Sequence, residues 1–268
     1  MICTKYKGDI MDAGYKRNII CEDSVEGIFT GVYHVYEKKY DKSCIELKIQ
    51  GDNENYELFT IDEFVPTDLE KAIKVSRTVK RKFGMEVYQA LLGAAFSQKE
   101  DKAQAIFGTI YYGLKATMTR NLLNNIKNED IFRVFELNRT VSNEANHYLD
   151  FVRFSELQNG VLYSKISPEN NVLPLIAEHF TDRLKNENFV IYDVKRKASL
   201  VYHTGYPWEI YNNIEVMDET LIYAECEEVV KNLWKSFCQA ISIQERCNLK
   251  LQKQNLPLKF RKFMTEFV

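Results

Sequence analysis

The order of apolar and polar residues predicts a helical middle and short strands toward both ends of the chain. After a short apolar strand at 19–21, apolar residues recur at helical spacing from Val25 to Val35. The segments 44–50 and 56–64 alternate between apolar and polar positions on either side of a polar turn. Alternation of this kind is typical of strands, so we expect the two segments to form a β-hairpin.

The middle of the chain carries the clearest helix signals. Asp23 is in place to cap the helix that begins near Val25. Thr67 and Glu70 have the spacing of a capping box, and Gly84 can end the helix that they start. Three further helices are expected, at about 86–98, 101–116 and 119–149.

Beyond residue 150 the period of the pattern changes from that of a helix to that of a strand. Asn159 and Gly160 lie between two strand-like runs and favour a two-residue hairpin turn, in which both positions need positive φ. An amphipathic helix over 171–186 and two more strand-like runs over 189–203 follow. This order predicts a β-β-α-β-β unit over about 150–203.

These elements define an α+β fold class, mostly helical with short antiparallel hairpins. Helices are also expected from about 218 to 267, with an interruption at Pro257. No stretch is rich enough in Gly, Ser or Pro to be a flexible linker, so we expect one extended domain over 1–268. The alternative is a tight division into 1–149, helical with an N-terminal hairpin, and 150–268, the hairpin-helix-hairpin unit with C-terminal helices.

The composition excludes several classes of protein. A formal net charge of −2 over 268 residues excludes a globally basic nucleic-acid-binding protein. No apolar run approaches the roughly 20 residues that cross a bilayer, and the start is too polar for a signal peptide. We therefore expect a cytoplasmic protein without a membrane partner. The six cysteines lack the spacing of an iron–sulfur cluster, so we expect no radical-SAM cofactor in this chain, and no other cofactor motif is present.

Arg153 is the first candidate for a catalytic or ligand-binding side chain. In the register that a two-residue turn imposes, Arg153 shares the apolar face of the hairpin with Phe151. A partly buried guanidinium needs an anion, because an unpaired buried charge is costly. Asp150, Glu144 or Glu178 could supply that anion from within the chain; a bound phosphate or carboxylate is the alternative.

Two acid and histidine pairs are further candidates for catalytic residues. Glu144 and His147 are three residues apart on one helix, so they share a face and could form a hydrogen bond. Glu178 and His179 are adjacent on the next predicted amphipathic helix. Either pair could serve acid–base chemistry. No known metal-ligand spacing is present, so no metal site is predicted.

Basic residues gather at three places that could contact nucleic acid. One helix carries a stripe at three- and four-residue spacing, made of Lys71, Lys74, Arg77 and Arg81, with Lys80 and Lys82 beside it. A predicted hairpin tip carries Lys195, Arg196 and Lys197, and a third cluster near the end of the sequence consists of Lys259, Arg261 and Lys262. Such clusters can follow a phosphate backbone, although a charged stripe on a helix is more often a solvated face.

The chain resembles a family described as DNA-metabolism or DNA-repair proteins, an uncharacterised domain. The resemblance rests on Glu-x-x-His at 144–147, on Phe-Val-Arg-Phe at 151–154 and on Pro-Glu-x-Asn-Val at 168–172, and it extends over most of the chain. The family is associated with a radical-SAM protein, and its domain is also found fused to uracil-DNA glycosylases. Its candidate site residues transfer to Glu144, His147, Arg153, Asn170 and His179, with Glu245, Arg246 and Asn248 near the end.

The resemblance implies a role in DNA repair or DNA metabolism, in contact with DNA and with a radical-SAM partner that carries the radical chemistry. One alternative is a hydrolase that acts on DNA by itself, with Glu144 and His147 as an acid–base pair. Another is a scaffold without catalysis, for which the acidic stretch 218–230 is a plausible protein-binding face.

Overall fold

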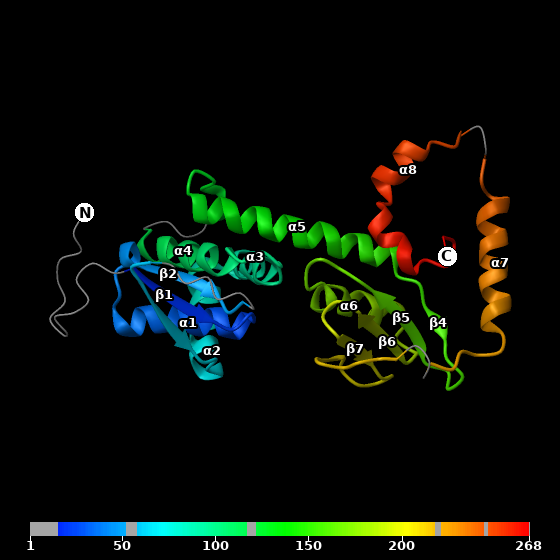
Figure 1. The fold of residues 1–268 in the computed structure, drawn as a ribbon, viewed down its shortest axis with the longest axis horizontal. Helices are drawn as coiled ribbons and strands as arrows, with labels where there is room; N and C mark the ends of the chain where they lie inside the picture. The colour runs from blue at the N-terminus through cyan, green and yellow to red at the C-terminus, as the bar shows by residue number, and fades with distance from the viewer. Residues whose placement is uncertain (1–15, 52–57, 117–121, 218–220, 244–245, 268) are drawn as a thin grey trace. The chain divides into compact units, whose positions relative to one another are not determined.

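Figure 1 shows a computed structural model of the chain, which describes residues 16–51, 58–116, 122–217, 221–243 and 246–267. The chain divides into two compact units, Met1–Val141 and Ser142–Val268, and the division falls within helix α5 (Glu129–Phe151). Helices predominate and the strands are short, so the predicted α+β class is confirmed. None of the described helices combines the length and the apolar content that a bilayer crossing requires.

The first unit contains a parallel three-stranded sheet. Its strands are β1 (Lys16–Cys21), β2 (Ile45–Ile49) and β3 (Thr60–Val65), in the order β2-β1-β3. Both β2 and β3 run parallel to β1, so the predicted hairpin between them is wrong. An alternating pattern determines which face of a strand is buried, but it carries no information about the neighbour or direction of that strand.

Helices cover one face of this sheet and form the core of the first unit with it. They are α1 (Val25–Lys38), α2 (Leu69–Phe83), α3 (Met85–Ala95), α4 (Lys102–Lys115) and the first part of α5, with short 3₁₀ turns at Lys42–Cys44 and Leu122–Asn124. Helix α1 packs on the sheet at ordinary contact distance, and a Cβ added at Gly31 would lie 3.4 Å from side-chain atoms of Cys21 and Leu47. Phe29 and Phe107 are fully enclosed in this core.

The helix ends follow the sequence signals with local corrections. Ser24, not Asp23, caps α1, and its hydroxyl accepts from the Gly27 N–H at 2.9 Å. Asp68, not Thr67, caps α2. Gly84 ends α2 as predicted, with a φ of 92° that favours glycine. Helix α5 begins at residue 129 instead of the predicted 119.

The second unit contains a mixed five-stranded sheet with one covering helix. The elements are β4 (Ser155–Glu156), β5 (Leu162–Ile166), α6 (Leu173–Arg183), β6 (Phe189–Asp193), β7 (Ala198–Tyr202) and β8 (Glu209–Tyr211), with sheet order β4-β5-β6-β7-β8. The first five strand and helix elements are the predicted β-β-α-β-β unit. Because α6 connects β5 to β6, these two strands are parallel, and the other neighbours are antiparallel.

The register of the β4–β5 hairpin differs by one residue from the prediction. Ser155 pairs with Tyr163 and Glu156 with Leu162, and the Leu157 N–H donates to the Val161 carbonyl at 2.9 Å, which leaves 158–160 as a three-residue loop. Gly160 alone in this loop has positive φ, at 76°, whereas a two-residue type I′ turn needs it at two positions. Arg153 lies outside the hairpin, in the segment between the end of α5 at Phe151 and the start of β4 at Ser155.

The C-terminal part consists of α7 (Glu227–Ala240), α8 (Leu249–Asn255) and a 3₁₀ helix at Leu258–Phe263. The helix expected from about residue 218 begins at 227, and residues 218–220 lie outside the described part. The predicted interruption at Pro257 is confirmed, since the proline caps the 3₁₀ helix.

Candidate functional site

The loop between β5 and α6 carries the Pro-Glu-x-Asn-Val motif, and Glu144 of α5 anchors it. Glu144 is 4% exposed. Its carboxylate accepts the backbone N–H of Glu169 at 2.9 Å and that of Asn170 at 2.8 Å, and the Asn170 side-chain amide at 2.7 Å. Glu144 thus accepts the hydrogen bonds of the loop amides, and buried N–H groups require such an acceptor.

These donors keep the buried carboxylate charged. Burial by itself raises the pKa of Glu144, but the N–H groups of Glu169 and Asn170 and the nearby Lys259 ammonium together lower the pKa below its ordinary value. Lys259 Nζ lies 3.4 Å from one oxygen of Glu144 and 3.2 Å from the Glu169 carboxylate. The anion therefore acts as a fixed acceptor.

Arg196, at the tip of the β6–β7 hairpin, holds the same loop from another side. Its guanidinium donates to the carbonyl oxygens of Pro168, at 3.2 Å, and Glu169, and pairs with the buried Asp193 at 3.0 Å. Lys197 pairs with Glu215, and Lys195 is exposed at the tip. Of the three residues predicted to contact nucleic acid at this tip, Arg196 and Lys197 thus form intramolecular interactions instead.

The hydrogen bond predicted between Glu144 and His147 does not form in the described structure. The His147 ring stacks on Phe151 at 5.7 Å between centroids and contacts Phe260 at 5.0 Å. His179 is exposed and touches the edge of Phe180. No group of three or more potential metal-binding side chains occurs among the described residues.

Arg153 meets an internal carboxylate, that of Glu266. Arg153 Nη2 lies 2.8 Å from Oε1 and Nε lies 3.3 Å from Oε2, a two-pronged contact. The Trp234 indole N–H donates to the same carboxylate at 3.2 Å, and the guanidinium lies 5.8 Å from the Trp234 ring. The internal pairing was anticipated, but none of the three acids proposed from the sequence supplies it.

The Glu266 carboxylate is stabilised in its charged form. Burial raises the pKa of Glu266, while the bonds from Arg153 and Trp234 lower it, and the net pKa lies below the ordinary value. Arg153 and Glu266 are 113 residues apart, so no spacing rule could have paired them.

Two residues suggested near the end of the chain are placed in the structure. Asn248 caps α8, where its side chain accepts the Leu251 N–H at 3.0 Å. Arg246 is exposed, and Glu245 lies outside the described residues.

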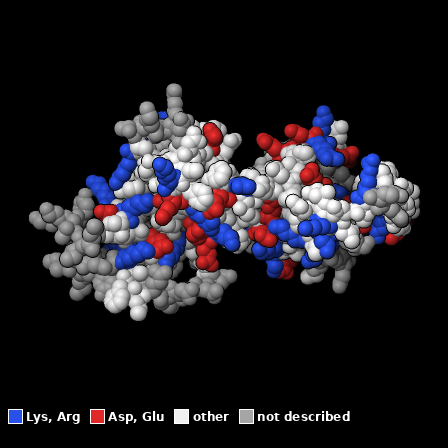
Figure 2. All heavy atoms as spheres, turned by 90° about the horizontal axis from the view of Figure 1, so that it is seen from above, with Lys and Arg blue, Asp and Glu red and all other residues white. Residues whose placement is uncertain are grey.

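Helix α2 presents an exposed basic face. It carries six basic residues and one acid, Glu70. Lys71 pairs with Glu37 at 2.8 Å. The other five are exposed, and none forms an ion pair with any described residue: Lys74, Arg77, Lys80, Arg81 and Lys82. On the face of the molecule seen in Figure 2, by contrast, basic and acidic side chains are interspersed.

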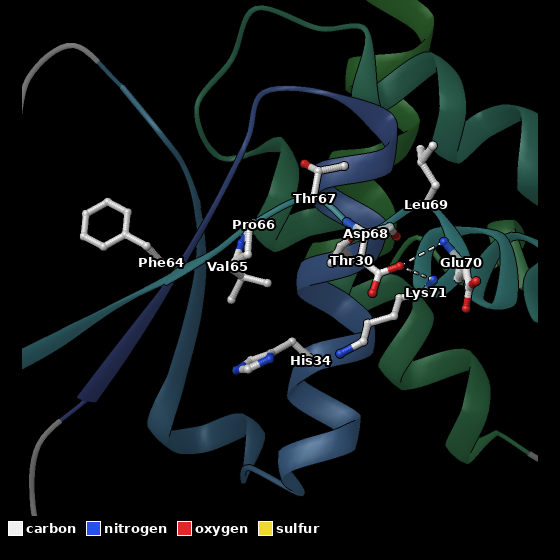
Figure 3. Close-up of a pocket in the computed structure, with 10 residues that line it drawn as sticks. All are labelled: Thr30, His34, Phe64, Val65, Pro66, Thr67, Asp68, Leu69, Glu70 and Lys71. Carbon is white, nitrogen blue, oxygen red and sulfur yellow. Dashed lines mark hydrogen bonds between the residues drawn. The ribbon is translucent and has the colours of Figure 1, made fainter.

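A pocket of about 670 Å³ lies beside the start of α2, between α1 and the end of β3 (Figure 3). Asp68 Oδ1 accepts the N–H of Glu70 at 2.9 Å and that of Lys71 at 3.2 Å, drawn as dashed lines. The first amides of α2 are thus occupied and do not form a free anion cradle. Lys71, which reaches toward His34 in this view, is neutralised by Glu37.

His34 at this pocket belongs to a cluster that sequence reasoning missed. Its Nε2 lies 2.8 Å from Glu63 Oε1, and the Tyr40 hydroxyl donates to Glu63 Oε2 at 3.1 Å. A carboxylate that fixes an imidazole is the arrangement of an oriented acid–base residue. The sequence signal for this cluster is the two-residue period of β3. Glu63 lies two residues before the buried Val65 and so shares the covered face of the strand, where a carboxylate needs a partner.

This geometry defines an α+β protein with an anchored loop, a half-buried ion pair and one exposed basic helix. The family model of the domain of unknown function DUF4130 matches residues 100–266, and the chain belongs to that family. No curated protein matches the chain. One solved structure, described as a DHH-domain member of the s1p family of ribosomal proteins, is similar at a TM-score of 0.32 and 10% identity, over 72% of this chain and 74% of that chain. A likeness this low carries no argument about function.

Proposed function

We propose that this protein contacts nucleic acid through the exposed basic face of α2, defined as Lys74, Arg77, Lys80, Arg81 and Lys82. The observation that carries the proposal is the set of five exposed cations on one 15-residue helix without an ion pair to any described residue. Release of counterions from phosphates favours binding at such a face without regard to base sequence. Helix α2 lies outside the matched family residues, so this argument is independent of the family.

The spacing of the basic face suits a phosphate backbone. Lys74 and Arg81 are seven residues apart, which corresponds to about 10 Å along a helix axis. One strand of a duplex advances about 3.4 Å per phosphate. The face therefore covers about three phosphates of one strand, and long side chains extend its reach.

The biological role that we propose is in DNA metabolism or repair, together with a partner that supplies radical-SAM chemistry. This part is supported only by the resemblance of the motifs at 144–147, 151–154 and 168–172. The absence of an iron–sulfur spacing among the cysteines is compatible with such a division of labour. We do not propose a DNA hydrolase, because Glu144 and His147 are engaged with different partners.

Charge reversal tests the face directly. The triple variant Lys74→Glu, Arg77→Glu and Arg81→Glu should weaken binding to a 20-base-pair duplex by at least about 50-fold at 100 mM salt, because it removes about three phosphate contacts. Fluorescence anisotropy of labelled duplex measures the affinity. Far-UV circular dichroism and the melting temperature should stay close to wild type, since all three side chains are exposed.

The matched control is a second triple variant, which changes the net charge by the same amount at other positions of the first unit. Lys99, Lys127 and Arg139 are exposed and lie on other segments, so their reversal to Glu should weaken binding only a few-fold. Equal losses in both triple variants would show a general charge effect and exclude a specific face. Unchanged affinity in the α2 variant would remove the assigned surface.

A further inference from the structure

Helix α7 exposes its apolar residues to solvent. Val229, Val230, Leu233, Phe237 and Ile241 are each 52% to 65% exposed. An amphipathic helix on a protein surface normally turns such a stripe toward its own core. A contiguous apolar surface of this kind marks an interaction site.

The side of α7 that faces its own unit is attached through polar groups instead. Glu227 is 7% exposed, and its carboxylate accepts the backbone N–H of Glu156 at 2.9 Å. Trp234 adds its hydrogen bond to Glu266. The helix is thus held in place on one edge while the apolar stripe stays open.

The stripe has the spacing of a helix–helix seam. Val230, Leu233, Phe237 and Ala240 follow one another at intervals of three, four and three residues, the a and d positions of a heptad repeat. The residues that border the seam are Val229, Trp234, Ser236 and Ile241, none of which carries a charge.

We propose that α7 pairs with α7 of a second copy of this chain, antiparallel about a two-fold axis. Antiparallel pairing brings Leu233 of one copy against Phe237 of the other, and Val230 against Ala240, so the seam is complementary to itself. Uncharged borders permit this pairing without like-charge repulsion, and they offer no charge that would select a different partner. The antiparallel arrangement also opposes the two helix dipoles.

The size of the seam predicts a weak dimer. Two helices of this length bury on the order of 1,000 Å² in total, which is the low end for specific protein pairs. The dissociation constant is therefore expected in the micromolar range, and the protein concentration must be varied across it.

Light scattering coupled to size-exclusion chromatography, from about 1 to 200 µM protein, tests the pairing. The wild-type mass should rise from 31.5 kDa toward twice that value. The variant Leu233→Glu with Phe237→Glu should remain at 31.5 kDa throughout, with an unchanged melting temperature because both side chains are exposed. A monomeric wild type at the highest concentration would overturn the proposal.

The control variant is Asn232→Glu with Gln239→Glu, which adds the same charge on the polar side of α7 and should dimerise like the wild type. If both variants dimerise, the contact lies elsewhere and the proposal fails. If both are monomeric, charge rather than the seam controls association, and the proposal also fails. The experiment contains no nucleic acid, so its result is independent of the proposed function.

Discussion

Replacing Glu144 with alanine is expected to lower the free energy of unfolding by about 3–5 kcal/mol. The substitution removes the acceptor of two backbone N–H groups and one side-chain amide in the loop between β5 and α6. Those donors then lose the acceptor that they share, and because Asn170 is itself 5% exposed, water replaces that acceptor only in part. Urea unfolding followed by circular dichroism measures the change.

The control for Glu144→Ala is Glu178→Ala, which removes an exposed acid from α6 of the same unit. It should change the free energy of unfolding by less than about 0.5 kcal/mol. A Glu144→Ala variant within about 1 kcal/mol of wild type would contradict the anchoring role.

The Glu144 effect should depend on pH with a defined sign. The folded-state pKa of this carboxyl is lowered from the ordinary value of 4.5, so its stabilisation is present above that value and is lost as the pH falls through the folded pKa. The stability difference between wild type and Glu144→Ala should therefore be largest near pH 7 and shrink in acid. A difference that grows on acidification would be incompatible with this sign.

Replacing Arg153 with alanine is expected to cost about 2–3 kcal/mol of unfolding free energy, because it leaves Glu266 without its main counter-charge. The Glu266 side chain is 14% exposed, so water replaces the lost partner only in part. Trp234 shares the carboxylate, and its fluorescence should change in the folded state. Urea unfolding and tryptophan emission measure the two effects.

A double-mutant cycle isolates this pair. Glu266→Gln alone should also destabilise, and the double variant should lose less than the sum of the single losses, with a coupling of about 1–2 kcal/mol. Arg183→Ala, an exposed arginine on α6, is the control and should be near neutral. Additive losses would mean that Arg153 serves another anion, which was the alternative that the sequence left open.

The parts of the fold that local chemistry determines could be predicted from the sequence. Gly84 ends α2 because few residues tolerate its backbone angles, and Pro257 interrupts the last helices because it cannot donate a hydrogen bond. The order of strands and helix around α6 follows from a change of period that is visible in the sequence. These signals act within a few residues of one another.

Features set by distant segments could not be predicted. The alternation in β2 and β3 fits an antiparallel hairpin and a parallel sheet equally well, and the choice depends on the insertion of β1 between them. One residue of loop length moved the β4–β5 register, and β4 begins only at Ser155, so Arg153 lies outside the hairpin.

Only part of the candidate site could be predicted from the sequence. The need of Arg153 for an anion follows from its apolar surroundings, but Glu266 is reached only by the return of the C-terminal segment. Glu144 and His147 share a helix face as expected. The loop amides donate to the Glu144 carboxylate, and aromatic rings contact the His147 imidazole. Glu144 and His147 therefore form no hydrogen bond with each other.

The salt dependence of DNA binding by the wild-type protein tests the central claim most directly. Anisotropy titrations with a labelled 20-base-pair duplex at 50, 100 and 200 mM salt give the slope of log affinity against log salt concentration. Three to five phosphate contacts predict a slope between about −3 and −4.5, or a loss of about 50- to 500-fold over this range. Absence of binding at 50 mM salt, or an affinity that does not change with salt, would contradict the proposal that α2 binds phosphates.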